Sequence, residues 1–360
     1  MTTPQLQDRP APAPAAPARA GGHLRIGSSV ALPVRRISVV VALVLLLLTV
    51  LAAVATLSLG RLGVPLHELP GAVLGGAEGK NRFVLNRLRG PRLVTGIGAG
   101  AALGLSGALF QSVTRNPLGS PDVIGLASGA GAGAAFFALF LPGSPIWLGA
   151  LLGAALAMAV VHVSTGTGFR DPGRLVVAGI GVAALATAFT QYVVYAVERD
   201  NATALTAYIN GSLAARSWDH ALTIGLVLLV AAPLTALVSR RLEMGEMGDE
   251  LAAGLGAEPR STKTSAVLLS IVLSAGAVSV AGPIAFISLT APQIARRLTR
   301  GTGPHLFLAA LTGALLLVLA DLAAQQVPWF DNLPVGIYTM AIGGLYLGYL
   351  LTREWRKGNL

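Results

Sequence analysis

The sequence predicts an all-α polytopic membrane protein with about ten transmembrane helices and both termini in the cytoplasm. Apolar residues make up 54% of the chain and charged residues 12%, about half of the roughly 25% charged residues usual in soluble domains. Long apolar runs recur between residues 37 and 351, and each can cross a hydrocarbon core of roughly 30 Å. We expect helices because a span must satisfy its own backbone hydrogen bonds inside the bilayer.

Breaks marked by charged residues, Pro and Gly divide the apolar region into ten spans. These are residues 37–60, 90–112, 123–141, 146–165, 174–197, 217–239, 263–281, 284–299, 305–326 and 334–352, of which 284–299 is the shortest. With the N-terminus inside, most Lys and Arg residues fall in cytoplasmic segments. This distribution obeys the positive-inside rule and predicts that both termini are cytoplasmic.

The ends of the chain differ in composition from the spans. Residues 1–36 are rich in Pro and Ala, a composition that buries too little apolar surface to order itself, and we expect a disordered cytoplasmic tail. Residues 37–352 form the transmembrane domain, and residues 353–360 form a short cytoplasmic tail. The first apolar run is too long for a signal-peptide core, so it is expected to remain as the first span.

The sequence contains no motif for a metal site, for nucleotide binding or for catalysis. The chain has no cysteine, which excludes disulfides and thiolate metal sites. Gly79-Lys80 lacks the other residues of a phosphate-binding loop, and we find no paired nucleophile and base and no metal-ligand cluster. We therefore expect no catalytic residue, no metal and no nucleic-acid partner, and we attribute the net charge of +10 to loop topology.

Asp321, in the run LLLVLADLAAQQ, is the most notable ionisable residue at membrane depth. Such residues are the default functional candidates. A single carboxylate can also bond neighbouring helices, and this structural role is the favoured interpretation. An ion-coupled secondary transporter using Asp321 remains an alternative, and it would require a second charged partner inside the membrane.

The polar stretch TRNPLGSPDVIG interrupts the apolar sequence between the second and third spans. Asn116-Pro117 is expected to close the preceding helix, because the residue before proline avoids the α conformation. Ser120-Pro121-Asp122 is typical of a helix start, with Ser as the N-cap, Pro at the first position and Asp in the first turn. In the span before this turn, Gly96, Gly100 and Gly104 predict close helix packing.

Residues 243–262 predict a cytoplasmic surface helix rather than a span. Met244, Met247, Leu251 and Leu255 share one face at helical spacing, and acidic residues occupy the rest of the first turns. Helices lying on a membrane surface favour Lys and Arg on their polar face. The segment therefore predicts a small apolar face for a protein partner.

Several motifs together resemble one family, the permeases of ABC importers for iron–siderophores, haem and vitamin B12. They are LRGPR (88–92), SGALFQSVTRNPLGSPDVIGLASGAGAGA (106–134), GDELAAGLG (248–256), AGPIAFISLTAPQIAR (281–296) and LADLAAQQVPWFDNLPVGI (319–337). The resemblance covers nearly all of residues 37–352, and members of the family have ten spans. The sequence TRNPLGSPDVIG is most similar to the corresponding stretch of ferric-siderophore permeases.

The resemblance implies a multi-pass subunit in a bacterial inner membrane. Two permease subunits, identical or paralogous, would surround a pathway for a ferric siderophore. Two separate ABC ATPase subunits would hold ATP and Mg, and an extracytoplasmic siderophore-binding protein would deliver the cargo. This chain would bind no cofactor and would not itself be an enzyme.

The resemblance also implies roles for individual residues, which fall into three groups. Binding-protein docking is expected at Arg89 and Arg92, where Pro91 would open the second span and direct its neighbours outward. ATPase coupling is expected at Met247, Asp249, Glu250, Leu251, Leu255 and Gly256. A pathway or gate is expected at Asn116, Pro117, Pro172, Gly173, Thr187, Thr190 and Gln191.

Two positions depart from the family pattern. Gln325 stands where many members carry a third outward arginine, and Pro172-Gly173 stands where the vitamin B12 member has a Thr-Ser pair. Both departures disfavour vitamin B12 as cargo. An importer of the same type for haem or vitamin B12 remains an alternative, as does a membrane scaffold without transport activity.

Overall fold

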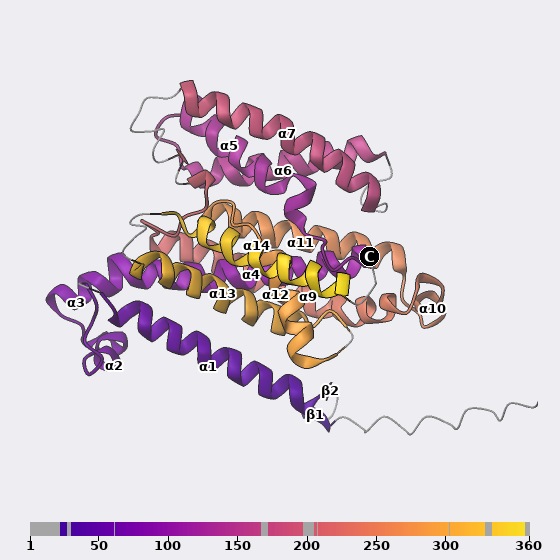
Figure 1. The fold of residues 1–360 in the computed structure, drawn as a ribbon, viewed down its shortest axis with the longest axis horizontal. Helices are drawn as coiled ribbons and strands as arrows, with labels where there is room; N and C mark the ends of the chain where they lie inside the picture. Colours follow the sequence, from indigo (N-terminus) through magenta and orange to yellow (C-terminus); the bar gives the residue numbers. More distant parts are fainter. Residues whose placement is uncertain are drawn as a thin grey trace, which may run out of the picture. The chain divides into compact units, whose positions relative to one another are not determined.

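The described part of the transmembrane region consists of helices and short connections, as the computed structural model shows (Figure 1). It describes residues 22–26, 30–60, 62–166, 172–196, 205–206, 208–301, 303–327 and 333–356. The main helices are α1 (Arg36–Ser58), α4 (Gly90–Thr114), α5 (Leu126–Phe140), α6 (Ile146–Thr165), α7 (Pro172–Ala196), α9 (Trp218–Glu246), α11 (Pro259–Ala281), α12 (Ile287–Thr299), α13 (Leu306–Gln326) and α14 (Val335–Arg356). These ten helices correspond in order to the ten predicted spans.

The helices differ in their ability to cross a membrane. Seven helical runs in the described part of the chain are long and apolar enough to do so, and two shorter apolar helices cover Leu126–Phe140 and Val335–Tyr349. The remaining helix, α12, has 13 residues and is therefore only about 20 Å long at 1.5 Å per residue. The span predicted at 284–299 is shorter than expected, because Phe286 adopts a left-handed conformation and the helix begins only after it.

A β-hairpin lies within the segment predicted to be disordered. Strand β1 (Gly22–Ile26) pairs antiparallel with β2 (Val30–Val34), and Leu24 faces Leu32 across the ladder. Apolar cross-strand pairs stabilise such ladders, and an argument from overall composition does not detect them. The structure thus describes two paired strands within this segment, residues 1–21 lie outside the described part of the chain, and the disordered tail stays a prediction.

Short helical turns precede α4: α2 (Leu69–Gly71), η1 (Ala72–Gly76), α3 (Gly79–Phe83) and η2 (Val84–Arg89). The helical run is continuous from Gly79 to Thr114. Pro91 occupies the first turn of α4, as predicted, although short helical turns lead into that helix without a break. The wide π-helical turn η2 ends at Arg89, and Gly90 separates it from the proline, which has no amide hydrogen to donate.

Helix α4 is central and packs against α9, α11, α12 and α13. Two of its predicted packing glycines touch the backbone of α13. A Cβ atom on Gly104 would lie 2.1 Å from the Ala309 carbonyl oxygen, and one on Gly100 would lie 2.4 Å from the Gly313 carbonyl oxygen. Because the α13 numbers fall as the α4 numbers rise, the two helices run antiparallel in backbone contact.

Helices α5, α6 and α7 pack against one another as a second group (Figure 1). A Cβ atom on Gly133 of α5 would lie 2.0 Å from the Gly149 carbonyl oxygen of α6, so these two helices also meet at glycines. The turn η3 (Pro121–Ile124) follows α4 and contacts α4, α5, α7 and α11. It is therefore placed to join the two groups.

The backbone contact predicts that Gly104→Ala destabilises the protein, because the new methyl group meets an unyielding carbonyl group. Overpacking of this kind costs about 1–3 kcal/mol. Gly225→Ala in α9 is the control, since a Cβ atom there meets nothing within 4 Å. Thermal unfolding of both purified variants in detergent checks this, and an unchanged melting temperature for Gly104→Ala would contradict the close contact.

Candidate functional site

Two clusters of charged residues lie at the two ends of α4. The helix has 25 residues, so its ends are about 37 Å apart at 1.5 Å per residue. Arg92 belongs to the first turn, and Arg115 directly follows the last helical residue. We call the first group, Arg89, Arg92, Arg216 and Asp321, the Arg92 cluster. We call the second group, Arg115, Asp249 and Lys263, the Arg115 cluster.

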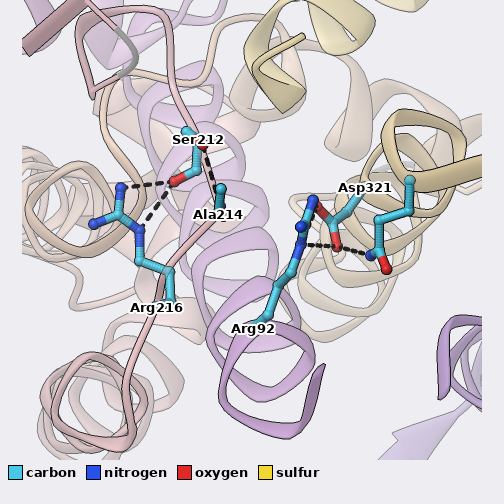
Figure 2. A network of polar contacts seen from close by, with 6 residues as sticks. Arg92, Ser212, Ala214, Arg216 and Asp321 are labelled. Carbon is cyan, nitrogen blue, oxygen red and sulfur yellow. Dashed lines mark hydrogen bonds and ion pairs between the residues drawn. The ribbon is translucent and has the colours of Figure 1, made fainter. Parts of the chain in front are cut away.

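In the Arg92 cluster, the guanidinium of Arg92 forms a salt bridge with the carboxylate of Asp321 in α13 (Figure 2). The Arg92 Nε lies 3.0 Å from each carboxylate oxygen, and Nη2 lies 2.7 Å from Oδ1. The Nε2 atom of Gln325 donates to Asp321 Oδ2 at 2.7 Å. The Asp321 side chain is only 3% exposed, so this bidentate pair satisfies a buried charge and ties α4 to α13.

Two more arginines interact electrostatically with Arg92. Arg216 donates from Nε and Nη2 to the Ser212 carbonyl oxygen at 3.0 and 2.8 Å (Figure 2), and its guanidinium lies 5.7 Å from the Tyr208 ring centre. Burial lowers the pKa of Arg216, and the charge of nearby Arg92 adds to this effect. Arg89 donates from Nη1 to the Thr56 carbonyl oxygen of α1 at 2.7 Å. Arg89, Arg92 and Arg216 together carry three positive charges against the one carboxylate of Asp321, so the cluster has an excess of positive charge.

In the Arg115 cluster, three helices meet at one carboxylate. Asp249 is the first residue of α10 (Asp249–Gly254) and pairs with Arg115 and Lys263. The Lys263 Nζ lies 2.6 Å from Asp249 Oδ2, and Arg115 Nη2 also donates to the Gly245 carbonyl oxygen at 2.8 Å. These contacts join the end of α4 to α9, α10 and α11.

The hydrogen bond from Lys263 is the main cause that lowers the pKa of Asp249, and partial burial opposes it. A carboxylate with a lowered pKa stays ionised, and keeps its partners, at all pH values above its usual range. The stabilisation from these pairs is therefore lost only as the pH falls through the lowered pKa of Asp249.

The turn between α4 and η3 (residues 115–120, the α4–η3 turn) is bonded internally and to α12. The Asn116 Oδ1 accepts from the Leu118 amide at 2.9 Å, and Gln293 Nε2 of α12 donates to the Pro117 carbonyl oxygen at 3.0 Å. Ser120 caps η3, as predicted, by accepting from the Asp122 amide. Asn116 and Pro117, proposed from the family as gate residues, are therefore part of a rigid turn.

The coupling segment is shorter than the sequence predicts. Helix α9 continues to Glu246, the chain bends at Met247 and Gly248, and α10 has only six residues. The prediction of one surface helix with Met244 on its face is wrong, because Gly248 adopts a φ of 114° that breaks the helix. Met247, Leu251 and Leu255 are nevertheless 55–62% exposed, and Glu250 and Gly256 are exposed as well.

The expected pathway residues of α7 separate into two sets. Thr187 and Gln191 are exposed one turn apart, whereas Thr190 is buried and donates to the Ala186 carbonyl oxygen of its own helix at 2.8 Å. That side of α7 packs against α5 within this chain, and a pathway position for Thr190 stays a prediction. Pro172 and Gly173 begin α7, and Gly173 is exposed, while the Pro172 side chain is outside the described set.

A scan against protein-family models matches residues 45–353 to the FecCD transport family. The chain belongs to the FecCD family. It is 37% identical over 327 residues to the ferric enterobactin transport system permease protein FepG of Escherichia coli K12, covering 90% of this chain and 99% of FepG. It is 35% identical over 321 residues to the Fe(3+)-citrate import system permease protein YfmE of Bacillus subtilis 168, covering 87% and 96% of the two chains.

A solved structure supports the fold of this FecCD protein. A metal-chelate type ABC transporter in an inward-facing conformation superposes with a TM-score of 0.76 at 25% identity, covering 87% of this chain and 99% of that chain. The chain is therefore a multi-pass permease subunit of an ABC transporter in a bacterial inner membrane, and it works with ATPase partners. The predicted all-helical fold and the non-enzymatic permease function are confirmed, whereas cytoplasmic termini remain a prediction.

Membership of the family decides between the uses of Asp321. Arg92 does supply the charged partner that an ion-coupled carrier would require. However, FecCD permeases belong to ABC transporters, and the pair lies near helix ends rather than midway along α4 and α13. Asp321 bonds α13 to α4 through Arg92, which agrees with the role favoured from the sequence, and that role stays a prediction.

The structure brings together residues that sequence reasoning kept apart or missed. Arg92 and Asp321 are 229 positions apart, and no sequence spacing indicates their pairing. Arg115, Lys263 and Gln293 were not singled out as site residues. In the described part of the chain, no group of three or more His, Asp or Glu side chains could hold a metal ion.

The Arg92–Asp321 pair predicts a strong energetic coupling. Arg92→Ala or Asp321→Ala alone leaves a buried charge without its partner, which costs about 3–5 kcal/mol. The double variant should lose less than the sum of the two, by at least about 1 kcal/mol. Unfolding of the four proteins in detergent measures this difference.

The matched control combines Asp321→Ala with Arg89→Ala. Arg89 bonds the Thr56 carbonyl oxygen rather than the carboxylate, so this combination should be close to additive. Additive losses for Arg92 and Asp321 as well would show that the ion pair does not hold the two helices together.

Proposed function

We propose that this FecCD permease moves a ferric siderophore across the cytoplasmic membrane. Similar permeases are named for ferric enterobactin, Fe(3+)-citrate and achromobactin transport. The Pro172-Gly173 departure disfavours vitamin B12. Exposed Thr187 and Gln191 give α7 small uncharged polar groups, which suit a bulky chelate that must pass without being held.

The working unit in this proposal contains two permease subunits, identical or paralogous. One face of α7 carries large exposed apolar side chains, among them Val177, Leu185 and Tyr195 at 72%, 76% and 91% exposure. A second permease can cover such a face and place α7 beside a shared pathway. Two ATPase subunits with bound ATP and Mg would drive transport, and an extracytoplasmic siderophore-binding protein would supply the cargo.

The observation that carries the coupling assignment is the exposed apolar face of α10. Leu251 lies in α10, which is too short to cross a membrane, and Met247 and Leu255 flank this helix; all three side chains are exposed. Ala252 of the same helix is buried, so the opposite side of α10 packs against the rest of the protein. This geometry suits insertion into a groove on an ATPase subunit, with hydrophobic contact as the driving term.

Docking of the binding protein is proposed at Arg89 and Arg92. Both guanidinium groups already bond within the chain, so they would attract acidic residues as members of the positively charged Arg92 cluster. Complementary charge of this kind raises association rates and fixes orientation, and salt weakens it. Gln325 does not replace the absent third arginine, because it bonds Asp321.

The coupling assignment predicts that Leu251→Asp with Leu255→Asp separates the permease from its ATPase. Two charges on the proposed contact face should lower ATPase co-purification at least about tenfold, equivalent to roughly 1.4 kcal/mol. The control carries the same change at Leu66 and Leu74, which are 65% and 88% exposed but precede α4. Normal co-purification of the Leu251/Leu255 variant would refute the coupling face.

The cargo assignment predicts selective, ATP-driven uptake by the reconstituted complex. Proteoliposomes containing the permease, ATPase and binding protein are offered ferric catecholate, ferric hydroxamate, ferric citrate, haem and vitamin B12. One ferric chelate should be taken up at least about tenfold faster than haem or vitamin B12, a discrimination of roughly 1.4 kcal/mol. A preference for haem or vitamin B12 would contradict the proposal.

A further inference from the structure

Arg115 holds an uncommon backbone conformation at the end of α4. It is the C-cap residue, with φ 49° and ψ 30° in the left-handed region. Glycine and asparagine adopt this region readily, whereas other L-residues do so at an energetic cost. Such a conformation persists only where surrounding contacts fix it. The contacts of the Arg115 guanidinium therefore need an explanation.

The Arg115 side chain bridges two sides of the bend that precedes α10. Its Nη2 donates to the Gly245 carbonyl oxygen in the last turn of α9 and to the Asp249 carboxylate at the start of α10. The Arg115 and Asp249 side chains are 45% and 46% exposed. Exposed ion pairs add little to the stability of a protein. The main effect of this bridge is therefore to hold α10 in position relative to the end of α4.

Beyond Arg115, the α4–η3 turn is bonded to helices deeper in the protein. Gln293 of α12 donates to the Pro117 carbonyl oxygen, and Ser288 of α12 donates to Asp122 Oδ2 at 2.8 Å. A Cβ atom on Gly179 of α7 would lie 2.4 Å from the Ile124 Cα, so η3 touches the α7 backbone. The contacts thus continue from α10 to α12 and α7.

We infer that Arg115 is a positioning residue that transmits displacement of α10 to the α4–η3 turn, and through it to α12 and α7. This inference rests on the proposed function of α10 as the ATPase contact. A contiguous series of packed and bonded groups is the physical requirement for such transmission. The exposed Thr187 and Gln191 of α7 would move with it.

The test uses Arg115→Gly, which removes the guanidinium and places the residue best suited to the left-handed conformation at this site. The variant is therefore expected to fold and to bind the ATPase normally. In proteoliposomes of the full complex, ATP hydrolysis and cargo uptake are measured on the same preparation. Uptake per ATP hydrolysed should fall at least about fivefold, within the range by which residues between coupled sites alter coupling.

Lys263→Gln is the matched control. Lys263 bonds the same carboxylate as Arg115 but belongs to α11 and makes no bond to the α4–η3 turn among the described contacts. It should keep uptake per ATP close to the unmodified complex. Normal uptake per ATP in Arg115→Gly, or an equal loss in Lys263→Gln, would overturn the inference.

A charge exchange separates transmission within the permease from direct contact of Arg115 with the ATPase. Arg115→Asp with Asp249→Arg, made together with Lys263→Gln, restores the ion pair between the α4–η3 turn and α10 with reversed polarity, without the bond to the Gly245 carbonyl oxygen. Restored uptake per ATP supports the inference, and failure to restore it overturns the inference. If Leu251→Asp/Leu255→Asp abolishes coupling while Arg115→Gly does not, only the transmission role fails, whereas normal coupling in both refutes the proposed function of α10.

Discussion

The backbone contact between α4 and α13 is the constraint on which the rest of the structure depends. Inside a bilayer, no hydrophobic effect drives one apolar helix against another, so close packing must supply the attraction. Gly100 and Gly104 permit this because a side chain there would strike the α13 backbone. The contact fixes the antiparallel register of the two helices. It thereby places Arg92 opposite Asp321, where a buried ion pair is satisfied.

Because α4 is fixed along its length, its two ends can serve different partners. One end carries the positively charged Arg92 cluster, and the other carries Arg115 beside α10. The α4–η3 turn then extends this fixed frame towards α12 and α7 through hydrogen bonds and backbone contact. A permease must change shape in response to events at its surface. In this arrangement, the turn carries a displacement of α10 as a bonded unit to α12 and α7, as inferred above.

The span positions are predictable from the sequence because hydrophobicity along a membrane helix is a local property. Helix α6, for example, covers the predicted residues 146–165. Features that depend on tertiary contacts were not predictable in this way. The Gly stripe indicated close packing but not that α13 is the partner, and Asp321 was recognised as a polar residue without its distant Arg92.

The site residues show the same division. Family motifs directed attention to the exposed Leu251 and Leu255, and they also included Thr190, which is buried within this chain. From the sequence, Arg115 is only one of the cytoplasmic positive charges. Its proposed role depends on a left-handed backbone conformation and on a carboxylate 134 positions away, neither of which the sequence indicates. The bend at Gly248 depends on the positive φ of this one residue. The spacing of apolar residues along the sequence does not predict such a bend.

The most direct test of this account is a distance measurement across the Arg115 bridge during the transport cycle. The chain contains no cysteine, so spin labels can be attached at cysteines introduced for exposed Leu118 in the α4–η3 turn and exposed Ala253 in α10. If the bridge joins the two segments, the distance between these labels stays constant with and without ATP, while a label pair between Leu118 and a residue of α1 changes. A Leu118–Ala253 distance that changes by several ångströms on ATP binding would contradict the account.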